Sequence, residues 1–247
     1  MSLPSDAFQL VAARPHEPVR TYHPRRSTLS AEREDSLRDV FPAFGFSVHD
    51  DELGPMPRTA DGALDTVALF GRSAPVVLEI GSGMGEATAA MAAADPDRDY
   101  LAVEAHVPGV AGLLKLVGRG GLTNVRVGHG DALDLVRQMI PTDSLDAIHI
   151  FFPDPWPKAR HHKRRLVQPS HVALLRSRLR VGGTLHCATD WVEYADAMLE
   201  ALTADEFLAN TVDGFVPRPA HRPMTKFEQR GLDRGHEIRD VIVRRVR

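Results

Sequence analysis

The chain has 247 residues, of which 43% are hydrophobic and 26% charged, and its formal net charge is −3. This length and composition are typical of a soluble globular protein with one well-buried core. They exclude a membrane-spanning chain, because no run approaches the ~18 apolar residues that a transmembrane helix needs. The N-terminus lacks a basic and apolar signal region, so we expect a cytoplasmic protein. The single cysteine, Cys187, excludes an internal disulfide and a multi-cysteine zinc site, and we expect it in the core.

The first 60 residues are rich in proline and carry no long apolar period. We therefore predict a partly mobile N-terminal extension over 1–60, with one short helix around residues 30–40. Four residues in it, Arg20, Tyr22, Arg25 and Arg26, form a basic group with one aromatic ring. This group is as compatible with a solvated tail as with an arm that contacts nucleic acid.

From residue 75 onward, predicted strands and helices alternate. The strands are expected at 75–80, 100–105, 124–128, 145–152, 183–189, 206–212 and 238–245, and the helices at 86–94, 107–118, 132–139, 169–179 and 191–202. Alternating βαβ units predict an α/β fold with a doubly wound, mainly parallel seven-stranded sheet. We assign residues 61–247 to this one domain.

The first predicted strand runs into a glycine turn, E-I-G-S-G-M-G, that contains Glu79, Gly81, Gly83 and Gly85. Strand, glycine turn and helix are typical of nucleotide-binding α/β domains. The dinucleotide pattern G-x-G-x-x-G/A fails because Glu86 stands at its third small position, and the chain contains no G-x-x-x-x-G-K-[ST] loop. The pattern E-x-G-x-G-x-G instead resembles the first motif of S-adenosylmethionine-dependent methyltransferases, whose ligand carries a sulfonium and an ammonium group that acids attract.

Acids also follow the next three predicted strands. Glu104 ends the second strand, about twenty residues after the glycines, where an acid can accept from both ribose hydroxyls. Asp131 follows the third strand and is suited to the exocyclic amine of adenine, and Asp154 follows the fourth. One such acid is an ordinary helix cap. Four acids at four consecutive strand ends indicate a ligand pocket lined by Glu79, Glu104, Asp131 and Asp154.

Several motifs together resemble the tRNA (guanine-N7-)-methyltransferase family. They are E-I-G-S-G-M-G, A-V-E-A, G-D-A, F-F-P-D-P-W-P-K-A-R-H-H-K-R-R-L, A-T-D at 188–190 and T-K-F-E at 225–228. The resemblance covers about residues 76–246 and implies a Rossmann-like methyltransferase fold. It also implies S-adenosyl-L-methionine as cofactor and transfer of its methyl group to N7 of the variable-loop guanine in tRNA. The N-terminal R-T-Y-H-P-R-R is only a loose match.

The resemblance also implies roles for individual residues. Asp154 falls on the family's active-site aspartate, and the substrate contacts fall on Lys158, Asp190, Thr225, Lys226, Phe227 and Glu228. In chemical terms, Asp190 or Glu228 could accept from guanine N1–H and the 2-amino group, and Phe227 could stack on a base. Because N7 has a lone pair, the reaction needs orientation and a carboxylate near the developing charge rather than a strong base.

A basic run without an acid follows the fourth strand. It contains Lys158, Arg160, His161, His162, Lys163, Arg164 and Arg165. Next to an acidic pocket, this run predicts a cationic rim for a polyanion, so we expect Arg160, Lys163, Arg164 and Arg165, together with Arg25 and Arg26, to contact the tRNA backbone. The histidines show no metal spacing, so no metal is expected. Trp156 and Trp191 are both candidates for core aromatics, and Trp191 is the stronger one.

Two alternative functions stay open. D-P-W is similar to the (D/N)-P-P-(Y/W) motif of amino-group methyltransferases, but here the second proline follows the aromatic residue. An RNA-binding protein on an inactive methyltransferase fold is the other alternative, and the four acids argue against it. The expected partner is tRNA, without a membrane or a metal, and the protein is expected to be a monomer or a homodimer.

Overall fold

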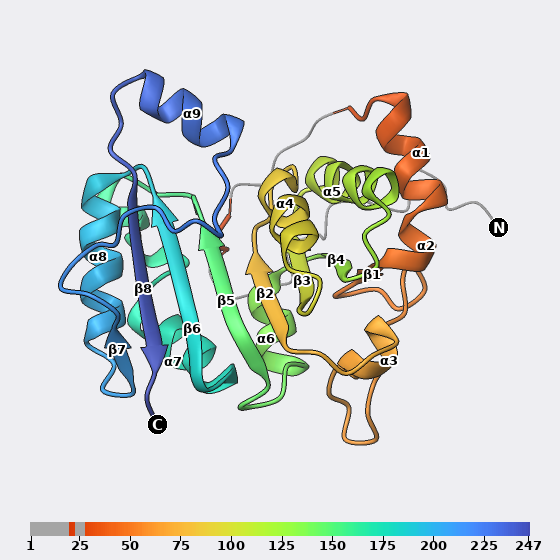
Figure 1. Ribbon diagram of the computed structural model, residues 1–247, viewed down its shortest axis with the longest axis horizontal. Helices are drawn as coiled ribbons and strands as arrows, with labels where there is room; N and C mark the ends of the chain where they lie inside the picture. The colour runs from red at the N-terminus through yellow and green to blue at the C-terminus, as the bar shows by residue number, and fades with distance from the viewer. Residues whose placement is uncertain (1–19, 23–27) are drawn as a thin grey trace. The chain divides into compact units, whose positions relative to one another are not determined.

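The computed structural model describes residues 20–22 and 28–247, and the chain divides into two compact units. Unit 1 comprises the described residues 28–141, and unit 2 comprises residues 20–22 and 142–247. Figure 1 shows helices and strands in both units. Each unit holds its own set of candidate site residues.

Unit 1 contains four parallel strands in the order β1-β4-β3-β2. Its strands are β1 (Gly45–Ser47), β2 (Val76–Ile80), β3 (Asp99–Glu104) and β4 (Val125–His129). Its helices are α1 (Ala31–Asp39), α2 (Phe41–Phe44), α3 (Thr66–Phe70), α4 (Glu86–Ala94), α5 (Val107–Gly120) and α6 (Ala132–Gln138). Strands β2 and β3 are buried along their whole length, as expected for parallel strands with both faces covered.

Residues 28–60 are part of the fold of unit 1. Helix α1 packs on α5, and Lys115 of α5 lies 2.5 Å from Glu32 of α1. Phe41 and Phe46 are 1% and 0% exposed, and a Cβ at Gly128 of β4 would lie 2.6 Å from the Phe46 ring. Burying two phenylalanines anchors β1 beside β4, which is why the described residues form one strand more than the sequence predicts.

Unit 2 contains four strands in the order β5-β6-β8-β7. Its strands are β5 (Leu145–Phe151), β6 (Leu179–Thr189), β7 (Leu208–Asn210) and β8 (Arg239–Arg245), and its helices are η2 (Ala159–Arg164, a 3-10 helix), α7 (Pro169–Arg178), α8 (Val192–Thr203) and α9 (Lys226–Asp233). β5 and β6 are parallel, whereas β8 runs antiparallel to both β6 and β7. Helix α8 contacts β6, β7 and β8, and the segment between β7 and α9 crosses in front of β8 in Figure 1.

The predicted α/β class and the order of its elements are confirmed. All seven predicted strands and all predicted helices are present, with ends that shift by a few residues. Elements α2, β1, α3, η2 and α9 were not predicted, and the described residues form eight strands rather than seven. Cys187 is buried in β6 as expected. Trp156, one of the two candidates for core aromatics, is a core residue at 2% exposed, but the expectation for Trp191 was wrong: it occupies the N-cap position of α8 and is 39% exposed.

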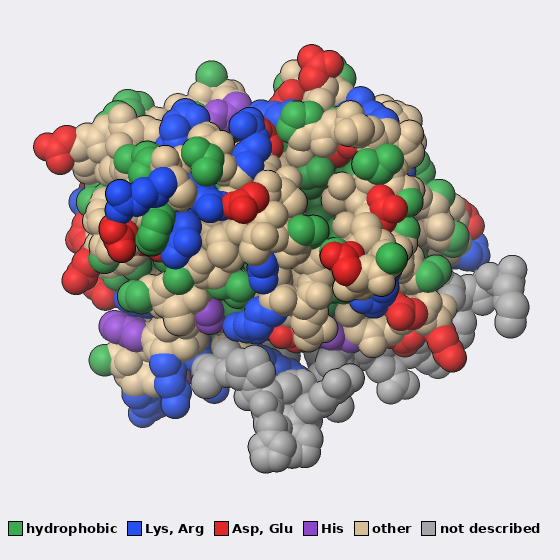
Figure 2. Space-filling model, turned by 90° about the horizontal axis from the view of Figure 1, so that it is seen from below, with side chains coloured by type: hydrophobic (Ala, Val, Ile, Leu, Met, Phe, Trp, Pro, Cys, Tyr) green, Lys and Arg blue, Asp and Glu red, His purple; other side chains and the backbone are tan. Residues whose placement is uncertain are grey.

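Basic and acidic side chains are interspersed at the lower edge of unit 2, which Figure 2 views from below. Arg245 at the end of β8 pairs with Asp143, Arg180 pairs with Asp146, and Arg247 lies 2.6 Å from Glu206. These three cations are therefore matched by acids. Within the described residues, no helix is both long and apolar enough to cross a bilayer.

Candidate active site

The glycine turn of unit 1 joins β2 to α4 and has the backbone geometry that only glycine adopts without strain. Gly81, Gly83 and Gly85 have φ values of +78°, +56° and +80°. At Gly85 a side chain is excluded for a second reason, since a Cβ would lie 2.5 Å from the Cβ of Leu113 in α5. At Gly81 and Gly83 a Cβ would meet no atom within 4 Å. The turn is thus packed at its helix end and open along its first half.

Glu104 at the end of β3 is tied to this turn by its carboxylate. Oε2 accepts from the N–H of Gly83 at 2.8 Å, and Oε1 accepts from the N–H of His106 at 2.8 Å. Helix α5 approaches the same point so closely that a Cβ at Gly109 would lie 2.4 Å from the Gly83 carbonyl oxygen. Each carboxylate oxygen can accept more than one hydrogen bond, so Glu104 is held in place and still has acceptor capacity.

Glu79 lies one residue before the end of β2 and is 2% exposed. Its Oε2 accepts from the Thr88 hydroxyl of α4 at 2.6 Å. Burial raises the pKa of Glu79 to about 7, against the opposing effect of the Thr88 hydrogen bond, and the charge of Glu104 adds to the increase. Glu79 therefore ties β2 to α4 beneath the glycine turn.

Asp131 follows β4 and caps the start of α6. Its Oδ1 accepts from the N–H of Leu133 at 2.8 Å, and burial raises its pKa above the ordinary value. Backbone hydrogen bonds align this strand end with its neighbours: the N–H of Gly81 donates to the carbonyl of Val103 at 2.8 Å, and the N–H of Gly130 donates to the backbone carbonyl of Glu104 at 3.1 Å. The predicted gathering of Glu79, Glu104 and Asp131 at the carboxyl ends of β2, β3 and β4 is what the structure shows.

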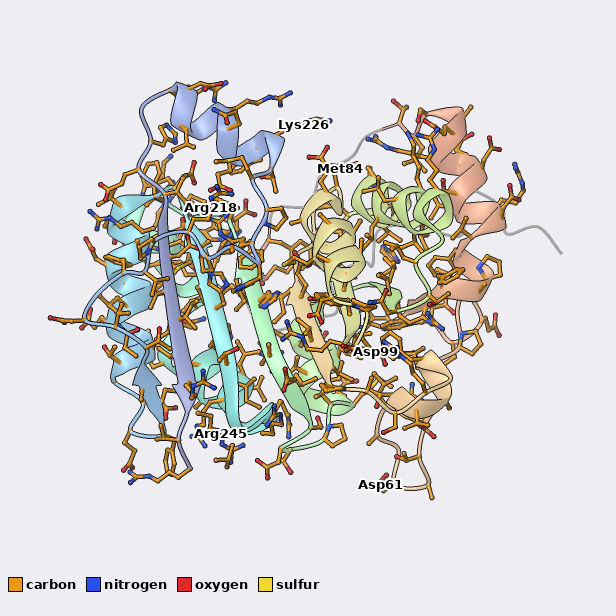
Figure 3. All side chains as sticks on the ribbon, in the orientation of Figure 1. Asp61, Met84, Asp99, Arg218, Lys226 and Arg245 are labelled. Carbon is orange, nitrogen blue, oxygen red and sulfur yellow. The ribbon has the colours of Figure 1, made fainter. Side chains whose placement is uncertain are left out.

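These carboxylates at the strand ends of unit 1 fit a nucleoside ligand that carries positive charge. Acids line the strand ends where a dinucleotide or nucleotide site would offer backbone N–H groups to phosphates. The open space over Gly81 and Gly83 lets a ligand approach the backbone, and Met84, which is 40% exposed, lies in the same turn (Figure 3). S-Adenosylmethionine has a ribose, an adenine and two cationic groups, and the residues present fit it.

In unit 2, the segment after β5 has an unusual backbone. Phe152 and Trp156 have φ values of +52° and +45°, which are rare for bulky residues, and they flank Asp154. Burial and a hydrogen bond fix this conformation: Trp156 is 2% exposed and its Nε1 donates to the carbonyl of Thr21 at 3.0 Å. Strain of this kind persists where the surroundings over-determine it, and it is common at functional sites.

The basic run that follows divides into two kinds of residue. Lys158, Arg160 and Lys163 are exposed and Arg164 is half-buried, with its guanidinium 4.8 Å from the centroid of the Trp156 ring. Among the described residues, no acid forms an ion pair with any of these four. We call Lys158, Arg160, Lys163 and Arg164 the basic segment.

Arg165 does not fit the expectation that it contacts a nucleic-acid backbone. It is 4% exposed, and its two terminal nitrogens bond both carboxylate oxygens of Glu193 at 3.0 and 2.5 Å. Its Nε donates to the carbonyl of Pro155 at 2.9 Å, and its guanidinium lies over the Tyr194 ring. Because its donors are used in this way, Arg165 holds the segment around Pro155 in place and is not available to a ligand.

T-K-F-E opens a helix that the sequence did not predict. Thr225 caps α9, and its Oγ1 accepts from the N–H of Glu228 at 3.1 Å, so Thr and Glu occupy the first and last positions of a capping-box sequence. The T-x-x-E spacing is a sequence signal for the start of this helix. Lys226 and Phe227 are exposed at the start of α9, where Figure 3 labels Lys226.

Glu228 is placed differently from the substrate contact that the resemblance implies. It is 2% exposed and forms a bidentate ion pair with Arg222, at 2.6 and 2.9 Å. Arg222 also donates to both oxygens of Asp240, at 2.7 and 2.8 Å. Because Arg222 takes both oxygens of Glu228 in the interior, we assign Glu228 to holding α9 in place rather than to reading a base.

Two other predicted substrate residues, Phe227 and Asp190, make contacts with distant segments of unit 2. The Phe227 ring, in a residue that is 56% exposed, lies edge-on to Phe152 with centroids 5.2 Å apart. Asp190 follows β6, and its Oδ2 lies 2.9 Å from Nδ1 of His236, a residue just beyond the end of α9. Three segments distant in sequence, those around Phe152, Asp190 and Phe227, thus converge. Arg25 and Arg26 lie outside the described residues, and for Arg20 and Tyr22 the structure adds no evidence of a nucleic-acid contact.

Comparisons with known proteins agree with this arrangement. A family model described as "Putative methyltransferase" matches residues 73–241. The tRNA (guanine-N(7)-)-methyltransferase of Streptomyces avermitilis is 51% identical over 92% of this chain and 76% of its own length. The protein of that name from Nitrosospira multiformis is 48% identical over 96% of this chain and 98% of its own.

Solved structures support the fold. The 16S rRNA methyltransferase KamB matches with a TM-score of 0.56 and 14% identity, over 77% of this chain and 95% of its own. The antibiotic-resistance methyltransferase Kmr matches with a TM-score of 0.52 and 17% identity, over 74% and 92%. The likeness to these two shows a methyltransferase-type α/β fold. The level of identity to the full-length relatives shows more: the chain belongs to the tRNA (guanine-N(7)-)-methyltransferase family.

Proposed function

We propose that this protein is an enzyme that transfers a methyl group from S-adenosyl-L-methionine to N7 of a guanine in tRNA, forming 7-methylguanosine. The observation that supports it most is the set of acids at the strand ends of unit 1, around an open glycine turn, in a chain of this family. Bound S-adenosylmethionine supplies an electrophilic methyl group on a sulfonium. The variable-loop guanine is the target that the family implies.

The residues of unit 1 would bind the cofactor. Glu104, already fixed by two backbone N–H groups, would accept from the ribose hydroxyls, and Asp131 would accept from the adenine amine. Gly81 and Gly83 would let the ligand contact the backbone. Glu79 would act from below, by holding β2 against α4. Preformed acceptors reduce the ordering that binding requires.

The residues of unit 2 would bind and orient the base. N7 of guanine carries a lone pair, so no proton has to leave before it attacks, and orientation supplies most of the catalysis. As the methyl group moves, positive charge passes into the purine, and a fixed carboxylate stabilises it. We assign that role to Asp154, in the strained segment after β5. Asp190 would accept from guanine N1–H and the 2-amino group, and Phe227 would stack on a base.

The basic segment would bind the tRNA backbone. Its four cations form no ion pairs with acids among the described residues, in contrast to the matched cations at the lower edge of unit 2. Phosphate contacts position the nucleic acid without reading its sequence, so this segment would supply affinity and register. Lys158 follows Asp154 by four residues and Lys226 directly precedes Phe227 in the sequence, and both lysines are exposed.

Incubation with bulk tRNA and methyl-labelled S-adenosylmethionine, followed by nucleoside digestion and mass spectrometry, tests the proposal. Labelled 7-methylguanosine is the expected product, and label on an exocyclic amine would replace the proposal with an amino-group methyltransferase. Asp154→Asn should lower the rate ~10²–10³-fold while tRNA binding is retained. Asp213→Asn, at an exposed acid in another loop, is the matched control and should leave the rate unchanged. tRNA binding without any methylation by the wild-type protein would favour an inactive binding protein.

A further inference from the structure

Three histidines of unit 2 meet on the sheet face that the β7–α9 segment covers. His149 of β5 and His186 of β6 are partners in the parallel register, so their side chains are on the same face. They are 3% and 1% exposed. His221 comes from the segment between β7 and α9 and is exposed. One ring nitrogen from each of the three lies within 4.8 Å of the others. We call these residues the histidine cluster.

Hydrogen bonds orient one member of the histidine cluster. His186 Nε2 lies 2.7 Å from Oδ1 of Asp240, which also accepts from Arg222. A carboxylate that Arg222 binds through both oxygens is an acceptor only, so Nε2 of His186 carries the proton. The lone pair of His186 is then on Nδ1, which lies 3.2 Å from Nε2 of His221. This is the tautomer that a metal-binding histidine adopts when a carboxylate accepts from its other nitrogen.

We propose that the histidine cluster binds one divalent transition-metal ion, with Zn²⁺ as the best fit, through His149, Nδ1 of His186 and Nε2 of His221. Zn–N bonds of ~2.0–2.1 Å in tetrahedral geometry place two ligand nitrogens about 3.3–3.4 Å apart. The 3.2 Å between His186 and His221 is close to this value, and all three ligand nitrogens lie within 4.8 Å of one another, so shifts of no more than about 1–2 Å bring them to coordination distance. His221 can contribute to these shifts because it is exposed on a segment between elements.

The surroundings are compatible with a dication. The guanidinium of Arg222 is the nearest buried positive charge, and it is matched by the carboxylates of Glu228 and Asp240, while the half-exposed Arg218 lies 4.0 Å from Glu228. Three imidazoles favour zinc, copper or nickel over calcium or magnesium, which prefer oxygen ligands. Bound there, the ion would fix the segment that carries Arg222 and leads into α9 onto β5 and β6.

A hydrogen-bonded stack of imidazoles is the competing explanation. His149 and His221 are stacked with centroids 5.8 Å apart, and His149 also stacks on Phe151 at 5.1 Å. A chain in which His221 donates to His186 and His186 to Asp240 is complete without an ion. The two explanations differ in what added metal does, because only a site for an ion gives the protein an affinity for zinc that depends on His221.

The test uses the full chain without a histidine tag, treated with a chelator and desalted, and then titrated with Zn²⁺ against a chromophoric chelator. We expect one Zn²⁺ per chain, a higher unfolding midpoint with Zn²⁺, and with Co²⁺ the visible absorption of a tetrahedral complex. His221→Ala should weaken binding at least tenfold and abolish the increase in the midpoint. This variant should fold, because the side chain that it removes is exposed.

Matched variants make the result decisive. His236→Ala removes another exposed histidine beside an acid, and it should leave zinc binding unchanged. A His16→Ala, His23→Ala variant controls for binding by histidines near the N-terminus. Absence of stoichiometric zinc binding, or binding that His221→Ala and His149→Asn both leave intact, would overturn the proposal in favour of the imidazole stack. Neither tRNA nor S-adenosylmethionine is present, so the result is independent of the proposed methyl transfer.

Discussion

The acids of the two units are used in different ways. In unit 1, Glu104 and Asp131 are held by backbone N–H groups, which orient a carboxylate without neutralising it. In unit 2, Glu228 and Asp240 share a buried arginine, and Glu193 binds another. The first arrangement leaves the carboxylates able to accept from a ligand, as the proposed cofactor site requires, whereas in the second the carboxylates stabilise the fold. An acid next to a sequence motif is therefore assigned to a ligand only after its partners are known.

The largest expected effect concerns the buried ion network of unit 2. Arg222→Met should destabilise the protein by about 3–5 kcal/mol, because it leaves Glu228 and Asp240 buried without their counter-charge. The free energy of unfolding in urea measures the loss. Arg218→Met is the control: Arg218 is 41% exposed and 4.0 Å from Glu228, so its loss should cost no more than about 1 kcal/mol.

A compensating variant sharpens this prediction. Adding Glu228→Gln and Asp240→Asn to Arg222→Met removes the uncompensated charges and should restore part of the lost stability. If the triple variant were no more stable than Arg222→Met, the loss would come from packing and not from charge. Equal stability of Arg222→Met and the wild type would contradict the structural role given to Glu228.

The next effect concerns the glycine turn of unit 1. Gly85→Ala should destabilise the protein by about 2–5 kcal/mol, because a Cβ at φ +80° is strained and would also lie 2.5 Å from Leu113. Gly71→Ala is the matched control, since its φ of +74° carries the same strain, but a Cβ there meets no atom within 4 Å. The difference between the two variants in urea unfolding isolates the steric part. Similar losses for both would show that α5 retreats to make room.

The strands and the glycine turn of unit 1 could be predicted from the sequence for a physical reason. Both are local signals, because the residues that form a buried strand such as Val76–Ile80, or a turn with positive φ such as that at Gly81, are themselves the signal. The strand-end acids could be placed together because parallel strands share an edge. What failed was pairing across distance. No spacing rule identifies Arg222, six residues before Glu228, or Glu193, 28 residues after Arg165, as the buried partner of each. His149, His186 and His221 are too far apart in the sequence to form a spacing motif.

The pH dependence of stability should carry a contribution from Glu79. Its pKa is about 7 in the folded protein and near 4.5 when unfolded, so the folded state binds the extra proton between these values. The sign follows: Glu79 favours folding most below pH 4.5, and that contribution is lost as the pH rises through 7. Relative to Glu79→Gln, the wild type should lose about 2–3 kcal/mol between pH 5 and pH 8. Unfolding free energies of both proteins at these pH values measure the difference.

Glu86→Gln is the control for this pH effect, because Glu86 is exposed in the first turn of α4. Its replacement should leave the pH dependence of the wild type unchanged. A parallel pH dependence for the wild type and Glu79→Gln would mean that Glu79 keeps its charge in the interior, and its bond to Thr88 would then stabilise the carboxylate fully.

The smallest expected effect separates the basic segment from Arg165. Replacing Lys163 and Arg164 with alanine should weaken tRNA binding and reduce the slope of log affinity against log salt by roughly 0.7–0.9 for each lost phosphate contact. The free energy of unfolding should change by less than about 1 kcal/mol, since neither residue pairs with an acid among the described residues.

Arg165→Met should have the opposite effects, because it breaks the bidentate pair with Glu193. It should lower stability and leave the salt slope unchanged. A reduced slope for Arg165→Met at unchanged stability would place Arg165 in the interface after all, and an unchanged slope for the double variant would remove the basic segment from it.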